Sequence, residues 1–142
     1  MNVKLVMFII GKVSLAFGVS LMIPLISAFI LGEKQIMEFV LPITLSFIFG
    51  GLMGRVKVEY KGHLSLREGM AILGFGWLLI SLLGALPYIY AGVDFISSIF
   101  ESISGFTTTG ATNVKDLSSV PASLILWRSL TQWLGGLGIL LI

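Results

Sequence analysis

Four long apolar runs constrain this chain more than any other feature of its sequence. They cover residues 13–31, 36–54, 69–90 and 123–142. Each is close to the roughly 20 residues that an α-helix needs to cross the hydrocarbon core of a bilayer. Charged residues make up only 11% of the sequence, whereas a soluble domain carries roughly 25%. We therefore predict an all-α membrane protein that crosses the membrane several times.

The same composition argues against several classes of function. The chain has no cysteine, so it forms no disulfide and no thiolate metal site. Its one histidine, His63, argues against a multi-histidine metal centre within one copy. A net charge of +2 is too small to indicate a nucleic-acid partner. The apolar runs hold no nucleophile–base constellation and no pair of carboxylates, so we expect neither an enzyme nor a cofactor.

The positive charges predict how the chain is oriented in the membrane. The loop between the second and third runs carries four Lys and Arg side chains: Arg55, Lys57, Lys61 and Arg67. Loops rich in Lys and Arg stay on the cytoplasmic side. The N-terminus, with Lys4 and Lys12, then lies on the same side. We expect a multi-pass protein of the cell membrane with a cytoplasmic N-terminus.

A shorter helix is predicted between the third and fourth runs. Within residues 93–104, apolar side chains recur at helical spacing, and Asp94 is a suitable N-cap. Gly105 is a suitable residue to end this helix. At 1.5 Å per residue the helix reaches about half-way across a bilayer. It either lies on the membrane surface or dips in and returns.

The segment that follows, GFTTTGATNV at residues 105–114, is polar and uncharged. Non-helical backbone is tolerated at membrane depth only where it is buried in protein or lines a watery cavity. Such a strand can turn carbonyl oxygens toward a dehydrated cation, and threonine hydroxyls supply further oxygens. Oxygen ligands without carboxylates favour a monovalent cation over Ca²⁺ or Mg²⁺. The alternative, a plain extracellular loop of turn residues, is equally compatible with this composition.

Two motifs, SGFTTTGAT at residues 104–112 and QWLGGLGI at residues 132–139, carry a family resemblance. Together with the rest of the chain they resemble the Trk/Ktr/HKT superfamily of potassium transporters, and most of all the bacterial Trk-type membrane subunit. The resemblance implies that a filter strand is formed by Thr108, Thr109, Gly110, Ala111 and Thr112. It places K⁺ at Thr108, Thr109 and Gly110. Glycine at the position of Gly110 is associated in this family with potassium rather than sodium.

The resemblance also implies a domain organisation. Residues 1–67 correspond to a two-helix transmembrane region with a basic cytoplasmic loop. Residues 68–142 correspond to the first helix–pore-loop–helix unit of a potassium-channel-like fold, with the last helix apparently truncated. Family members surround the ion with four such units, so the remaining units must come from the same protein or from other copies. The family implies a homodimer in the full-length form and a cytoplasmic nucleotide-binding regulatory subunit.

Two charged residues could support the filter from behind. Arg128 lies in the fourth apolar run, where a charge is costly and usually has a partner or a function. Glu101, on the short helix, is the candidate partner. Alternatively, Arg128 reaches the outer interface and Glu101 faces water. For the whole chain we predict a channel-like potassium uptake subunit. The alternatives are a non-conducting membrane scaffold or assembly subunit, or a Na⁺-permeable member of the same family.

Overall fold

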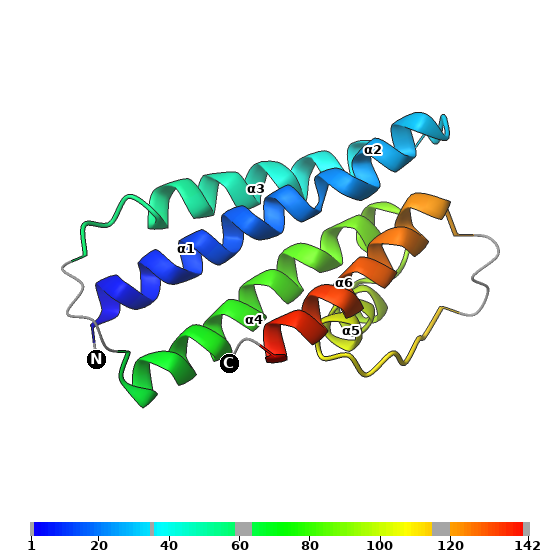
Figure 1. Cartoon of the computed structure of the whole chain (residues 1–142). Coiled ribbons are helices and arrows are strands. Elements are labelled where there is room, and N and C mark those ends of the chain that lie inside the picture. The colour runs from blue at the N-terminus through cyan, green and yellow to red at the C-terminus, as the bar shows by residue number, and fades with distance from the viewer. Residues whose placement is uncertain (1, 35, 59–63, 115–119, 141–142) are drawn as a thin grey trace.

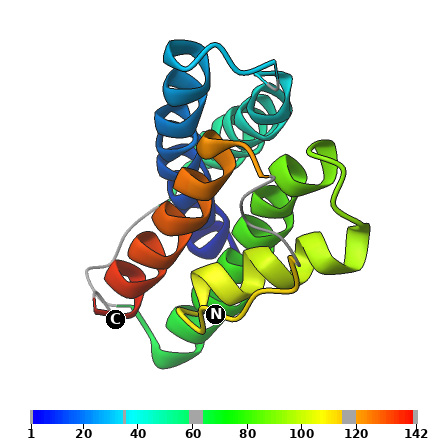
Figure 2. The same cartoon turned by 90° about the vertical axis from the view of Figure 1, so that its right-hand side faces the viewer.

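The computed structural model describes residues 2–34, 36–58, 64–114 and 120–140, and every regular element in these residues is an α-helix. The helices are α1 (Val3–Ser20), α2 (Met22–Ile30), α3 (Met37–Met53), α4 (Leu66–Tyr90), α5 (Phe95–Phe106) and α6 (Ala122–Leu140). The long helices run side by side, and α5 crosses them steeply (Figures 1 and 2). Residues 3–30 and 66–90 are long and apolar enough to cross a membrane.

The first apolar run differs from its predicted limits. Its helix begins at Val3, ten residues before the predicted start at residue 13, and Asn2 caps it by accepting a hydrogen bond from the Leu5 amide (3.3 Å). Lys12 therefore lies within the helix, with its ammonium 5.3 Å from the centre of the Phe8 ring. The helix is interrupted at residue 21. The cause is Pro24, which has no N–H to donate to the carbonyl one turn earlier.

α1 and α3 pack closely as an antiparallel pair (Figure 1). Small residues allow this approach: a Cβ on Gly11 would lie 2.7 Å from the Gly54 nitrogen. A Cβ on Gly50 would meet the Leu15 side chain, whereas Gly51 faces open space. We call the unit formed by α1, α2 and α3 the N-terminal hairpin.

The N-terminal hairpin is attached to the later helices by a carboxylate at each end. At the end where α1 begins, Glu68 accepts hydrogen bonds from the amides of Asn2 (2.6 Å) and Ser65 (2.9 Å), completing a capping box for α4. At the other end, Glu33 accepts hydrogen bonds from the amide (3.3 Å) and the hydroxyl of Ser123, in the first turn of α6.

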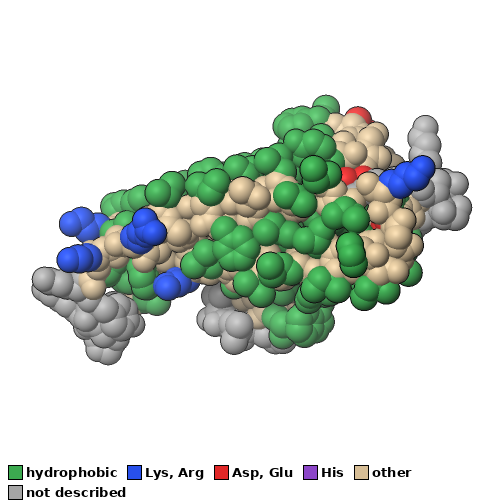
Figure 3. Space-filling view, turned by 90° about the horizontal axis from the view of Figure 1, so that it is seen from above, with side chains coloured by type: hydrophobic (Ala, Val, Ile, Leu, Met, Phe, Trp, Pro, Cys, Tyr) green, Lys and Arg blue, Asp and Glu red, His purple; other side chains and the backbone are tan. Residues whose placement is uncertain are grey.

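Between these two ends the surface is apolar. Figure 3 shows hydrophobic side chains along the length of the helices, most of the visible Lys and Arg side chains at the end where α1 begins, and a further basic side chain at the opposite end. Large apolar side chains on several helices are well exposed, among them Phe29 (75%) and Phe75 (63%). An apolar band with a basic rim at one end is the surface of a membrane-embedded helix bundle.

An aromatic cluster joins the N-terminal hairpin to the later helices. Phe17 of α1, Phe106 of α5 and Trp127 of α6 are almost completely buried. The ring centre of Phe17 lies 5.8 Å from that of Phe106 and 5.6 Å from that of Trp127. The Trp127 indole N–H donates to the carbonyl of Gly84 on α4 (3.1 Å), so the buried polar atom of this cluster is satisfied.

Candidate functional site

α5 buries its polar side. Its serines, including Ser97 and Ser104, and Glu101 are buried, while Ile96 is 79% exposed and Phe95 is 64% exposed. Asp94 caps the helix by accepting a hydrogen bond from the Ser97 amide (3.0 Å). This hydrogen bond lowers the pKa of the Asp94 carboxyl. The buried polar side is the side that meets the segment after α5.

The end of α5 differs from the prediction. Gly105 was expected to end the helix, but the helix includes Phe106, and Thr107 is the C-cap residue. The backbone turns instead at Thr108, which has a φ of 58°. Gly105 has a packing role: a Cβ there would run into the Thr131 side chain of α6.

The segment 107–113 is exposed and runs back along α5 in the opposite direction. The Gly110 amide reaches the Ser104 carbonyl (3.3 Å), and the Ser104 hydroxyl donates to the Ala111 carbonyl (2.7 Å). Further along, the Asn113 side chain donates to the Ser97 hydroxyl (2.7 Å). The partners on α5 thus move from its last turn to its first turn as the segment proceeds.

Glu101 is the centre of this arrangement. Its side chain is fully buried. One carboxylate oxygen accepts hydrogen bonds from the Thr112 hydroxyl (2.7 Å) and the Asn113 amide (2.6 Å). The other accepts from the Arg128 Nε (3.1 Å). A buried carboxylate with three donors is well compensated for the loss of water.

Arg128 of α6 connects the carboxylate to the exposed segment. Its Nε bonds to Glu101, and its Nη2 donates to the carbonyl of Gly110 (3.0 Å). The Arg128 side chain is 21% exposed. Glu101 and Arg128 therefore face each other, and the guanidinium holds both the short helix and the strand that follows it.

These contacts divide the backbone carbonyls of the segment into two groups. Those of Gly110 and Ala111 accept hydrogen bonds from Arg128 and Ser104. Within the part of the chain that the structure describes, no donor reaches the carbonyl oxygens of Thr108 and Thr109. Gly110 has a φ of 74°, a conformation that favours glycine. The five predicted filter residues thus lie on one exposed segment, and among the described residues no donor reaches the carbonyls of Thr108, Thr109 and Thr112.

Sequence reasoning missed Ser97, Ser104 and Asn113 as partners of this strand. A signal was present: Ser97, Glu101 and Ser104 recur at the i, i+4, i+7 spacing of one helix face. Two other residues considered from the sequence, Lys61 and His63 of the basic loop, lie outside the described residues.

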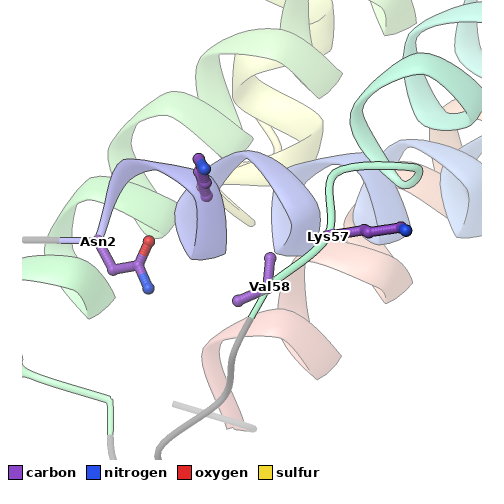
Figure 4. A pocket seen from close by; sticks show the side chains of 4 residues that line it. Asn2, Lys57 and Val58 are labelled. Carbon is purple, nitrogen blue, oxygen red and sulfur yellow. The ribbon is translucent and has the colours of Figure 1, made fainter.

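The basic end of the bundle offers little for binding. A pocket there is lined by Asn2, Lys4, Lys57 and Val58, and Figure 4 shows Lys57 pointing away from Asn2. Among the described residues, no group of His, Asp and Glu side chains could hold a metal ion. The braced strand after α5 is therefore the candidate site.

The helices and the apolar band define an all-helical membrane protein. Residues 35–142 match the TrkH family of cation transport proteins, and the chain belongs to that family. This confirms the predicted class, and the family comprises cation transporters rather than enzymes.

Individual relatives agree with this assignment. An uncharacterized cation transporter of Methanocaldococcus jannaschii is 31% identical over 99% of this chain and 30% of its own length. The Trk system potassium uptake protein TrkH of Escherichia coli K12 is 30% identical over 100% of this chain and 30% of its own length.

The crystal structure of the potassium transporter TrkH from Vibrio parahaemolyticus superimposes with a TM-score of 0.90 at 27% identity. The superposition covers 98% of this chain and 30% of the TrkH chain. The chain thus spans about 30% of the length of the relatives that it matches, and the match with TrkH confirms the predicted all-α membrane fold.

Proposed function

We propose that this chain takes part in potassium transport across the cell membrane and that residues 108–112 contribute one strand of a cation filter. One observation carries the proposal: an exposed, uncharged strand is held in a fixed position by contacts with α5 and α6. These contacts involve the buried Glu101, Arg128 and Ser104. A plain surface loop needs no such support. The names of the relatives point to the same ion.

The chemistry of the strand suits a monovalent cation. The carbonyls of Thr108 and Thr109 are free to replace water around a dehydrated ion. The carboxyl end of α5 lies at the start of the strand, and its partial negative charge favours a cation there. The carbonyl of Gly110 already accepts from Arg128, so in this conformation we assign the contact with K⁺ to Thr108 and Thr109 before Gly110.

One strand cannot surround an ion, so further strands must complete the filter. We infer that they come from other pore units of the same protein or from other copies. In this proposal residues 68–142 act as the first pore unit and residues 1–67 as the N-terminal region beside it. A homodimer, a cytoplasmic nucleotide-binding subunit and a cytoplasmic N-terminus belong to the same proposal, and the basic end of Figure 3 supports that orientation.

Uptake of rubidium or potassium by potassium-starved cells without their own uptake systems tests the proposal. The protein is expressed as its gene encodes it, with Gly110→Asp as the test variant. Gly32→Asp is the matched control, because Gly32 shares the positive φ (66°) of Gly110 and a Cβ there would meet no atom within 4 Å.

Loss of uptake in Gly110→Asp, with uptake retained in Gly32→Asp, is the expected result. Equal uptake in the two variants would contradict the filter and favour a non-conducting scaffold. The same assay with sodium separates a potassium-selective protein from a Na⁺-permeable one.

A further inference from the structure

Phe106 fixes the point at which the filter strand begins. It is the last residue of α5, directly before Thr107, and it is 1% exposed. Any movement of the Phe106 backbone is passed to the strand within one or two residues, because the amides of Thr107 and Thr108 donate hydrogen bonds to carbonyls of the last turn of α5. The surroundings of Phe106 therefore bear on the geometry of the strand.

Glycines hold Phe106 tightly on two sides. On the α4 side, a Cβ on Gly84 would lie 2.8 Å from the Phe106 ring. On the α6 side, a Cβ on Gly135 would run into the Phe106 carbonyl group. The backbone and ring thus fit closely against α4 and α6, with no room for an added methyl group.

An aromatic ring covers the side of Phe106 that faces the N-terminal hairpin. The Phe17 ring of α1 packs against Phe106 (5.8 Å between centres) and edge-on against Trp127 (5.6 Å). Phe17 is 5% exposed. Its ring pairs with Phe106, the residue directly before the strand, so it can influence the strand through Phe106.

We propose that Phe17 is a positioning residue for the filter strand, and that through it the N-terminal hairpin contributes to cation selectivity. The inference rests on the proposed filter function. A smaller side chain at position 17 leaves space into which Phe106 can move. The strand then begins from a shifted point, and the oxygens of Thr108 and Thr109 shift with it. Discrimination between K⁺ and Na⁺ depends on the placement and number of such oxygens.

The test uses Phe17→Leu in the protein as its gene encodes it. The readout is the ratio of Na⁺ to K⁺ uptake, which does not depend on how much protein reaches the membrane. Phe39→Leu is the matched control: Phe39 is also fully buried in the N-terminal hairpin, and among the described residues it forms no aromatic pair. Phe29→Leu, on the exposed surface of α2, controls for the substitution itself. Phe17→Met is a second variant that fills the same space with a flexible chain.

We expect the ratio to rise several-fold in Phe17→Leu, to rise less in Phe17→Met, and to stay unchanged in both controls. An unchanged ratio in Phe17→Leu would overturn the inference, as would an equal rise in Phe39→Leu. Gly110→Asp, run in parallel, separates the two proposals. If it leaves uptake intact, the filter itself is wrong. If it abolishes uptake while Phe17→Leu keeps the normal ratio, only the role of Phe17 is wrong.

Discussion

The buried pair of Glu101 and Arg128 offers the sharpest test of how the strand is held. Glu101→Gln preserves the shape of the side chain and removes its charge. A Gln has one acceptor oxygen, which can serve Thr112 and Asn113 or Arg128, but not all three donors. At least one donor loses its partner, and the Arg128 guanidinium loses its counter-charge.

The magnitude follows from these losses. A hydrogen bond to a charged group contributes about 1.5–3 kcal/mol, and breaking a buried pair by removing one partner costs about 3–5 kcal/mol. Arg128 is 21% exposed, so water replaces part of its interaction with Glu101, and the lower end of the range of about 3–5 kcal/mol applies. We expect Glu101→Gln to lower the free energy of unfolding by about 3 kcal/mol, roughly a hundredfold in the folded-to-unfolded ratio.

The assay is denaturation of the purified protein in mixed detergent micelles, followed by tryptophan fluorescence, since Trp127 is fully buried. The double variant with Arg128→Gln removes both charges together. We expect it to be about 1–2 kcal/mol more stable than the sum of the two single losses predicts. Arg55→Gln, at an exposed arginine, is the control and should change stability by less than about 0.5 kcal/mol. Strictly additive losses for Glu101 and Arg128 would refute the reasoning.

Three further predictions concern the helices around the site. Gly135→Ala forces a methyl group into the backbone at the end of α5, so it should lower the free energy of unfolding by about 1–3 kcal/mol in the same denaturation assay. Gly136→Ala should lower it much less, because the nearest neighbour of a Cβ on Gly136 is 3.9 Å away. Equal losses in the two variants would contradict this packing. Glu33→Ala removes the acceptor at the start of α6 and should lower stability by about 1 kcal/mol, which an unchanged unfolding midpoint would disprove. Asp94 has a lowered pKa in the folded protein, so its contribution to stability is complete above the ordinary aspartate pKa and is lost as the pH falls through the lowered one. The unfolding midpoint should accordingly lose part of its acid dependence in Asp94→Asn.

Much of the fold could be predicted from the sequence because hydropathy over some twenty residues is a strong signal. Four apolar runs and a short helix were expected, and within the described residues helices cover almost all of them. The residues at which the helices begin and end were less predictable. α1 begins ten residues early because Lys4 and Lys12 are tolerated in a helix at a membrane interface, where long basic side chains can reach water. Charge marked the edge of the apolar run, but it did not mark the edge of the helix.

The strand was predicted better than its supports. Threonine and glycine in a row signalled an unusual backbone, and Glu101 and Arg128 were considered together because charges in apolar runs are rare. Asn113 carries no such signal, since isolated polar residues are common near turns, whereas Ser104 could have been found from its helical spacing with Ser97 and Glu101. Gly105 was misjudged because glycine ends helices often, yet here it provides space for Thr131. Only the packing distinguishes these two uses of glycine.

The contact between Glu33 and Ser123 has a consequence for the order of assembly. The two residues are 90 positions apart, and synthesis from the N-terminus delivers the N-terminal hairpin to the membrane well before α6 exists. The hairpin therefore reaches the membrane before α6 does, and it carries Glu33 at the end opposite to the start of α1. The acceptor that α6 needs for its first turn is thus synthesised before α6 itself, so this contact can form as soon as α6 has inserted.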